Sequence, residues 1–188
     1  MSDIQKFSDA IKVNVSLKSI EPQYANTSWT GQRVTRSTGI QYYEVSMTLQ
    51  FNKKSYPEFN RFMATYSQSR PFLISLGLYG KYAGVQTGVL IVTTTTAAGN
   101  STFPCNNKLE VGSLIQFSNH NKLYRVMPGT TNTSITVFPF LQQNVQMGEV
   151  VKYDNLMVEM TIDPDNDWTM PIANKVDVSI KGREVING

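Results

Sequence analysis

The stretch Tyr42–Phe51, "YYEVSMTLQF", alternates apolar and polar side chains along its whole length. A period of two is that of a β-strand, whose successive side chains point to opposite faces. Strands with one solvent-exposed face are typical of antiparallel sheets. The apolar face of this strand holds Tyr43, Val45, Met47, Leu49 and Phe51. We therefore expect a mainly β protein.

The same alternation recurs nearer both ends of the chain. "KVNVSLKSI" begins at Lys12, and "NKVDVSIKG" begins at Asn174. The side chains expected to point inward are Val13, Val15 and Leu17 in the first strand and Val176, Val178 and Ile180 in the second. These strands predict an outer antiparallel β-sandwich.

One helix is predicted in the stretch "SYPEFNRFMATYSQ", at about 56–67. Ser55 and Glu58 have the spacing of a capping box, and Pro57 is tolerated in a first turn. Its apolar residues recur at steps of three and four: Tyr56, Phe59, Phe62, Met63 and Tyr66. A helix that lies on a sheet needs such a stripe, so packing is favoured over a ligand groove.

From about Val85 to Thr161 the sequence is rich in Thr and in short β-type runs separated by turns. Short strands at this spacing predict a small barrel or sandwich. We expect two parts: an outer β-sandwich with one helix, residues 1–84 plus 162–188, and a small inserted β-barrel domain, residues 85–161.

The connection Glu21–Gln41 is long and polar, and it predicts a functional loop. Trp and Arg side chains are common anchors of interfaces. The alternative is a surface loop with its Trp folded onto its own sheet. With the neighbouring strand, the predicted protein interface comprises Tyr24, Trp29, Arg33, Arg36, Tyr43, Val45 and Met47.

Composition excludes several kinds of partner. Only 16% of the 188 residues are charged, so neutral polar groups cover much of the surface and cost less to bury than ions. The net charge of +3 is scattered, which argues against direct nucleic-acid recognition. The single Cys105 allows no internal disulfide and no cysteine cluster for zinc. No apolar run is long enough to predict a membrane-spanning segment, and synthesis in the cytoplasm is expected.

The search for reactive groups turns up only weak candidates. The lone His120 lies between Asn119 and Asn121, which predicts a solvated hairpin tip, a poor place for a general base. "DPDNDW" at 163–168 has alternate Asp residues but lacks the Gly and Glu that a calcium loop requires. A turn is favoured there over a bound cation. We predict a protein that is not an enzyme, with no catalytic residue, no cofactor and no metal.

Residues 109–149 resemble a β domain of tail proteins from tailed bacteriophages. In that domain a turn leads into a strand ending "I-Q-F", and a hairpin then leads to "K-x-Y-x-V". A Thr/Val strand and "P-x-L" follow, and a Gly with an acidic residue begins the last strand. The matching residues here are Leu109, Gly112, Ile115, Gln116, Phe117, Lys122, Tyr124, Val126, Thr136, Val137, Pro139, Leu141, Gly148 and Glu149. Ser113 departs from the pattern, since the family commonly has Asp. The flanking Trp29, long strand and aromatic helix are also similar to minor-tail and distal-tail proteins.

This resemblance implies a tail-tube-like fold and a structural protein of the virion, at the tail tip or baseplate. Copies would form a ring, trimeric or hexameric, that extends, closes or braces the tail tube beside other tail proteins. Strands Tyr42–Phe51 and Lys175–Lys181 would hydrogen-bond to neighbouring copies. The alternative is a carbohydrate- or receptor-binding β module, with Tyr79, Tyr82 and Tyr124 as stacking faces.

Overall fold

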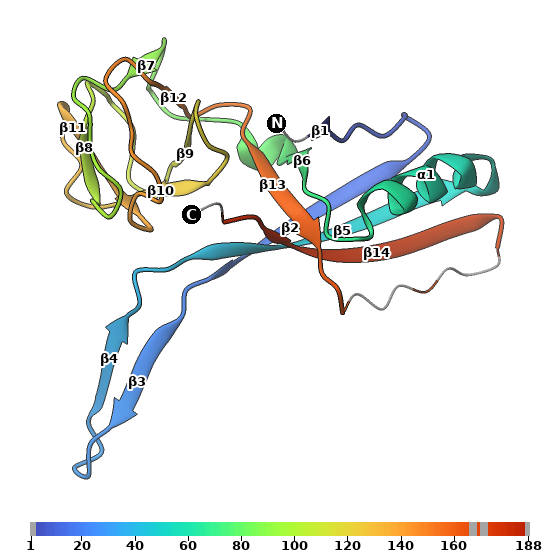
Figure 1. The fold of residues 1–188 in the computed structure, drawn as a ribbon, viewed down its shortest axis with the longest axis horizontal. Helices are drawn as coiled ribbons and strands as arrows, with labels where there is room; N and C mark the ends of the chain where they lie inside the picture. The colour runs from blue at the N-terminus through green and yellow to red at the C-terminus, as the bar shows by residue number, and fades with distance from the viewer. Residues whose placement is uncertain (1–2, 166–168, 170–172, 187–188) are drawn as a thin grey trace. The chain divides into compact units, whose positions relative to one another are not determined.

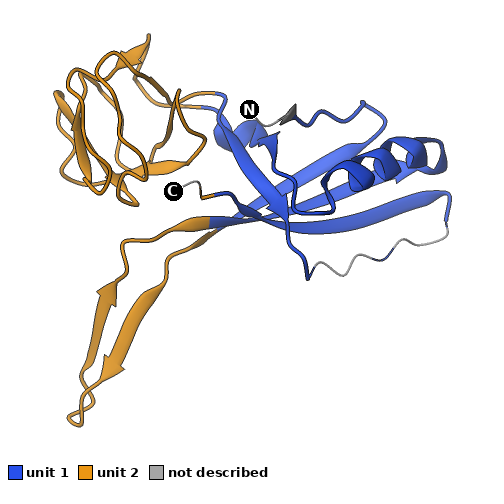
Figure 2. Cartoon of the chain, in the orientation of Figure 1, with its two compact units in different colours: residues 1–18, 43–81, 155–185 blue, residues 19–42, 82–154, 186–188 orange. Residues whose placement is uncertain are grey.

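The computed structural model describes residues 3–165, 169 and 173–186 of the chain (Figure 1). It is mainly β, with 43% strand and 10% helix, and its antiparallel sheets curl into half-barrels, which confirms the predicted fold class. The chain divides into two compact units (Figure 2). Unit 1 comprises residues 1–18, 43–81 and 155–185, and unit 2 comprises residues 19–42, 82–154 and 186–188.

Unit 1 is built on a six-stranded sheet in the order β1-β6-β13-β14-β5-β2. Strands β6, β13, β14 and β5 pair antiparallel, whereas β1 joins β6 in parallel. The strands are β1 (Asp3–Ile4), β2 (Lys12–Ile20), β5 (Tyr42–Asn52), β6 (Phe72–Ser75), β13 (Met157–Ile162) and β14 (Lys175–Glu184).

The two longest strands of unit 1 bury alternate side chains, as the sequence predicts. In β5 the buried positions include Val45 and Leu49, and in β14 they include Val178 and Ile180. β5 and β14 pair in register from Asn52 with Lys175 to Glu44 with Arg183. A slip of one residue would turn every apolar side chain outward, so the burial of one face specifies this register.

The predicted helix is confirmed as α1 (Tyr56–Tyr66), after the 3-10 turn η1 (Lys53–Ser55). Its buried side chains stack on the sheet: the rings of Phe59 and Phe51 lie 5.2 Å apart, and those of Phe62 and Phe72 lie 5.4 Å apart. The predicted capping box is wrong. Ser55 makes no side-chain cap, and the carboxylate of Glu58 accepts hydrogen bonds from Ser8 instead. A second 3-10 turn, η2 (Gly77–Gly80), follows β6.

Unit 2 contains a second six-stranded sheet, in the order β7-β12-β9-β10-β11-β8. An antiparallel bridge between Val92 and Cys105 joins the ends of β7 and β8, so the strands form a ring. Inside lie buried rings such as Phe103 and Phe117, 5.1 Å apart. The strands are β7 (Leu90–Ile91), β8 (Thr102–Pro104), β9 (Leu114–Phe117), β10 (Tyr124–Val126), β11 (Ser134–Phe138) and β12 (Val150–Lys152).

The predicted domain boundaries need two corrections. β13, placed by the sequence in the inserted domain, pairs with β6 and β14 in the sheet of unit 1. The continuous part of unit 2 is therefore residues 82–154 rather than 85–161. Residues 19–42 also group with unit 2, and they contain two strands where a loop was expected: β3 (Gln23–Thr27) and β4 (Arg33–Ser37).

Candidate assembly surface

Strands β3 and β4 form a separate two-stranded antiparallel ribbon, the β3–β4 ribbon. Every residue of both strands is exposed. The exposed fraction is 98% for Trp29 in the connecting turn, 72% for Tyr24 and 60% for Val34. Isolated two-stranded hairpins are marginally stable in water, and large apolar side chains gain free energy when they are covered. The ribbon is therefore a candidate contact surface.

The pairing register divides the side chains of the ribbon between two faces. Tyr24 lies opposite Arg36, and Asn26 lies opposite Val34, so these four share one face. Arg33 lies opposite Thr27 on the other face. The structure thus brings together Tyr24 and Arg36, and it adds Val34, which was not among the predicted residues.

A tight turn presents Trp29 at the end of the ribbon. The Ser28 N–H donates to the Gln32 carbonyl at 2.8 Å, and the Gly31 N–H donates to the Ser28 carbonyl at 2.9 Å. Gly31 has a φ of +82°, a left-handed conformation that glycine adopts without steric cost. The turn holds its backbone hydrogen bonds while leaving the indole uncovered.

The base of the ribbon is fastened to the barrel within unit 2. The ammonium of Lys122 donates to the Gln41 side chain at 3.0 Å, and Arg125 forms an ion pair with Glu21 at 3.1 Å. Gly39 lies against the ring of Phe140, where an added Cβ would come within 2.8 Å of a ring carbon. These contacts fasten the two ends of the ribbon to the barrel.

The other three residues of the predicted interface lie elsewhere. The exposed fraction is 2% for Tyr43 and 0% for both Val45 and Met47, because they belong to the core face of β5. Their inclusion in the interface is wrong, since an inward-facing side chain presents no surface to a partner.

The strands predicted to pair with neighbouring copies are also interior strands. β5 lies between β14 and β2, and β14 lies between β13 and β5, so both edges of each strand are already paired. β2 is the long strand at an edge of this sheet. A strand added from outside would therefore pair with an edge strand, the long β2 or the two-residue β1, rather than with β5 or β14.

His120 is buried rather than solvated, which corrects the prediction of an exposed hairpin tip. Its ring stacks on Phe117 at 5.1 Å and is 7% exposed. Nε2 lies 2.9 Å from the Tyr124 hydroxyl, and Nδ1 contacts the side-chain oxygen of Asn119. The Asn119 side-chain oxygen can only accept, so the proton of the neutral ring is on Nδ1 and Nε2 accepts from the Tyr124 hydroxyl. The Tyr124 oxygen in turn accepts the Gln142 N–H at 3.0 Å.

This environment favours a neutral imidazole. Burial lowers the pKa of His120 from 6.5 to about 4. Both ring nitrogens are used in hydrogen bonds inside the barrel, so the side chain fixes the turn before β10. The nearby Glu149 accepts the backbone N–H groups of Asn119 and Gln146, both at 3.1 Å, and thereby orders the same region.

Other reactive groups are similarly enclosed. Cys105 is fully buried in the barrel core, and this burial raises the pKa of its thiol to about 11. No group of three or more His, Cys, Asp and Glu side chains that could hold a metal ion occurs among residues 3–165, 169 and 173–186. Of the predicted acidic turn, Asp163 and Asp165 are described, whereas Asp167 lies outside the described residues.

The tyrosines predicted as stacking faces do not form a common platform. Tyr124 is 0% exposed in the barrel core. Tyr82 packs edge-on against Tyr153 at 5.0 Å. Tyr79 is 64% exposed but belongs to unit 1. Tyr124 therefore has no free face for a sugar, and Tyr82 is partly buried.

Comparisons with known proteins leave the family open. No protein-family model matches the chain, and no curated protein matches it. Within the part of the chain that the structure describes, no helix is long and apolar enough to cross a membrane.

Proposed function

We propose that this protein is a non-enzymatic structural protein of a bacteriophage virion, at the tail tip or baseplate. It assembles with itself into a trimeric or hexameric ring and contacts neighbouring tail proteins, so that the ring extends, closes or braces the tail tube. The resemblance of residues 109–149 to a phage tail domain supports this proposal. In that setting the chain is made in the host cytoplasm and ends in the tail.

The exposed β3–β4 ribbon is the observation on which the proposal rests. Its Trp29, Tyr24 and Val34 side chains are mostly uncovered, although the base of the ribbon is fastened in place. Rigid aromatic anchors lose little conformational entropy on binding and are common at the centres of interfaces. An ordered ribbon with uncovered aromatic and apolar side chains is suited to an assembly contact.

The composition and the use of His120 support the same role. Charged residues are 16% of the chain, so its surfaces can be desolvated at lower cost than those of an average protein. The one imidazole serves packing and hydrogen bonding inside the barrel. Both the low charge content and the packing role of His120 fit a structural protein.

Negative-stain microscopy of the purified full-length protein tests the proposal, first alone and then with tail proteins of its phage. We expect rings with a central lumen, or incorporation that depends on the tail proteins. A protein that stays monomeric under both conditions contradicts the proposal. Binding to a glycan array by that monomer would instead support the carbohydrate- or receptor-binding alternative.

A further inference from the structure

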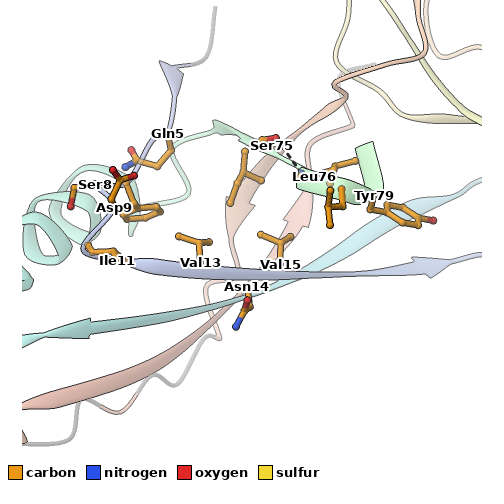
Figure 3. Close-up of a pocket in the computed structure, with 14 residues that line it drawn as sticks. Gln5, Ser8, Asp9, Ile11, Val13, Asn14, Val15, Ser75, Leu76 and Tyr79 are labelled. Carbon is orange, nitrogen blue, oxygen red and sulfur yellow. Dashed lines mark hydrogen bonds between the residues drawn. The ribbon is translucent and has the colours of Figure 1, made fainter. Parts of the chain in front are cut away.

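Unit 1 contains a groove of about 720 Å³ along the edge strand β2 (Figure 3). Val13 and Val15 point into it from β2, and Leu76 and Tyr79 line it from the segment after β6. Ser8 and Asp9 lie at the opposite end from Tyr79 (Figure 3). The groove is thus mainly apolar along its length and acidic at one end.

The strand beside this groove has a free backbone edge. β2 runs from Lys12 to Ile20 and pairs with β5 on one side only. At an edge, alternate residues turn their N–H and C=O groups away from the sheet, and these groups accept a further strand. The groove therefore offers both backbone hydrogen bonds and apolar pockets, which together define a site for strand addition.

We propose that the groove of one copy receives the β3–β4 ribbon of a second copy. This inference rests on the proposed function and names the two surfaces that meet in the assembly. The ribbon has the complementary properties: its two strands pair only with each other, so each has a free edge, and its Tyr24, Val34 and Arg36 share one face. Added to β2, that face turns towards the groove.

The charges of the two surfaces are complementary. Asp9 is the one charged residue among the described residues that line the groove. The segment 22–41 contains Arg33 and Arg36 and no acidic residue. Placing Arg36 near Asp9 sets the direction of the ribbon, because opposite charges chiefly determine orientation and register. Trp29 then lies towards the Tyr79 end.

The lengths of the two surfaces agree with this placement. Arg36 lies four residues along the ribbon from Gln32, which closes the turn, or about 13 Å at roughly 3.3 Å per residue. Trp29 lies beyond Gln32, in the turn. The lining segment from Asp9 to Val15 spans at most about 20 Å on the same basis. The ribbon from Arg36 to its turn is therefore short enough to lie along the groove.

The symmetry of the contact follows from the two surfaces being different. A ribbon and a groove make a head-to-tail contact, and repeated head-to-tail contacts close into a ring when the rotation per copy divides a full turn. The contact is therefore compatible with the ring in the proposed function, whereas a two-fold dimer would need one surface to meet itself.

Cross-linking between full-length copies tests the inference. Trp29→Cys protein is mixed with Tyr79→Cys protein and treated with a short bismaleimide. Ala64→Cys, on the exposed face of α1 and outside the groove, is the matched control partner. Native Cys105 stays in place because its thiol is buried in the barrel. We expect a product of doubled mass with Tyr79→Cys and none with Ala64→Cys.

Sedimentation of the unmodified protein is measured in parallel, to separate this inference from the proposed function. Assembly without the Trp29–Tyr79 product overturns the inference and leaves the proposed function standing. No assembly, alone or with tail proteins, overturns both. A cross-link that forms only inside one copy of a Trp29→Cys, Tyr79→Cys double variant also overturns the inference, because the ribbon then covers its own groove.

A charge exchange tests the direction of the ribbon. Asp9→Lys alone and Arg36→Glu alone are expected to abolish the cross-link, and the double variant is expected to restore it. Arg33→Glu, on the opposite face of the ribbon, is expected to retain it. Equal loss in the Arg33 and Arg36 variants, without restoration by the exchange, contradicts the proposed orientation.

Discussion

Acidification is expected to weaken the barrel of unit 2 through His120. The pKa of this imidazole is lowered from 6.5 to about 4 by burial against Phe117. At about 1.4 kcal/mol per pH unit, the difference of about 2.5 units corresponds to about 3 kcal/mol. Below pH 6.5 the imidazole is protonated in the unfolded chain but stays neutral in the folded barrel. The free energy of unfolding therefore decreases as the pH is lowered, and the loss is complete near pH 4.

The physical cause of this sign is desolvation, because the charged imidazolium loses its hydration inside the barrel. Protonation of Nε2 also removes the acceptor that faces the Tyr124 hydroxyl at 2.9 Å. Protonation is therefore coupled to disruption of the contact between His120 and the start of β10.

Two measurements check this prediction. Because the chain has one histidine, an NMR titration of the imidazole gives its pKa without assignment. Denaturant unfolding between pH 7 and pH 4 then gives the free energy, for the native protein and for His120→Gln, which removes the titrating ring. We expect the native protein to lose about 3 kcal/mol more than the variant. An imidazole that titrates near 6.5, or equal pH slopes for both proteins, would refute the reasoning.

Three further predictions concern unit 2. Tyr124→Phe removes a hydroxyl that satisfies a buried imidazole and a backbone N–H, and it should lower the free energy of unfolding by about 1–3 kcal/mol in denaturant titrations; no change would contradict the network. Phe103→Ala leaves a cavity at the centre of the barrel and should cost about 3–5 kcal/mol in the same assay, unless the core collapses around it. Gly39→Ala places a methyl against Phe140 and should speed hydrogen exchange at the base of the β3–β4 ribbon, whereas Gly31→Ala, which meets no atom within 4 Å, should leave the base unchanged.

Patterns that depend on one buried face could be predicted from the sequence. The alternation in β5 and β14 predicted the correct strands and the correct inward residues, because a period of two is specific to a strand with one buried face. The stripe of α1 was equally informative, since Phe59 and Phe62 recur at helical spacing and must meet a sheet. These elements needed no knowledge of tertiary contacts.

Features that depend on which segments meet could not be predicted in this way. β13 has the local pattern of any short strand, and only its pairing with β6 and β14 assigns it to unit 1. Similarly, Glu58 has capping-box spacing, but its carboxylate accepts hydrogen bonds from Ser8, which is distant in sequence. Local spacing does not report a competing partner from elsewhere in the chain.

The candidate site was predicted in part. The residue types of Tyr24, Trp29, Arg33 and Arg36 indicated an exposed contact segment, but their polar strands bury no face and so gave no periodic signal for a ribbon. The asparagines around His120 indicated a turn, but they gave no sign that its ring packs on Phe117. The failure there came from equating a turn with exposure to solvent.

Sedimentation of the full-length protein and its Trp29→Ala variant tests the central claim most directly. Trp29 is 98% exposed, so its removal should leave the thermal unfolding of the chain unchanged. We predict that the native protein sediments as a closed oligomer, alone or with tail proteins, and that Trp29→Ala sediments mainly as a monomer under the same conditions. Identical assembly by the two proteins, or a native protein that never assembles, would contradict the account.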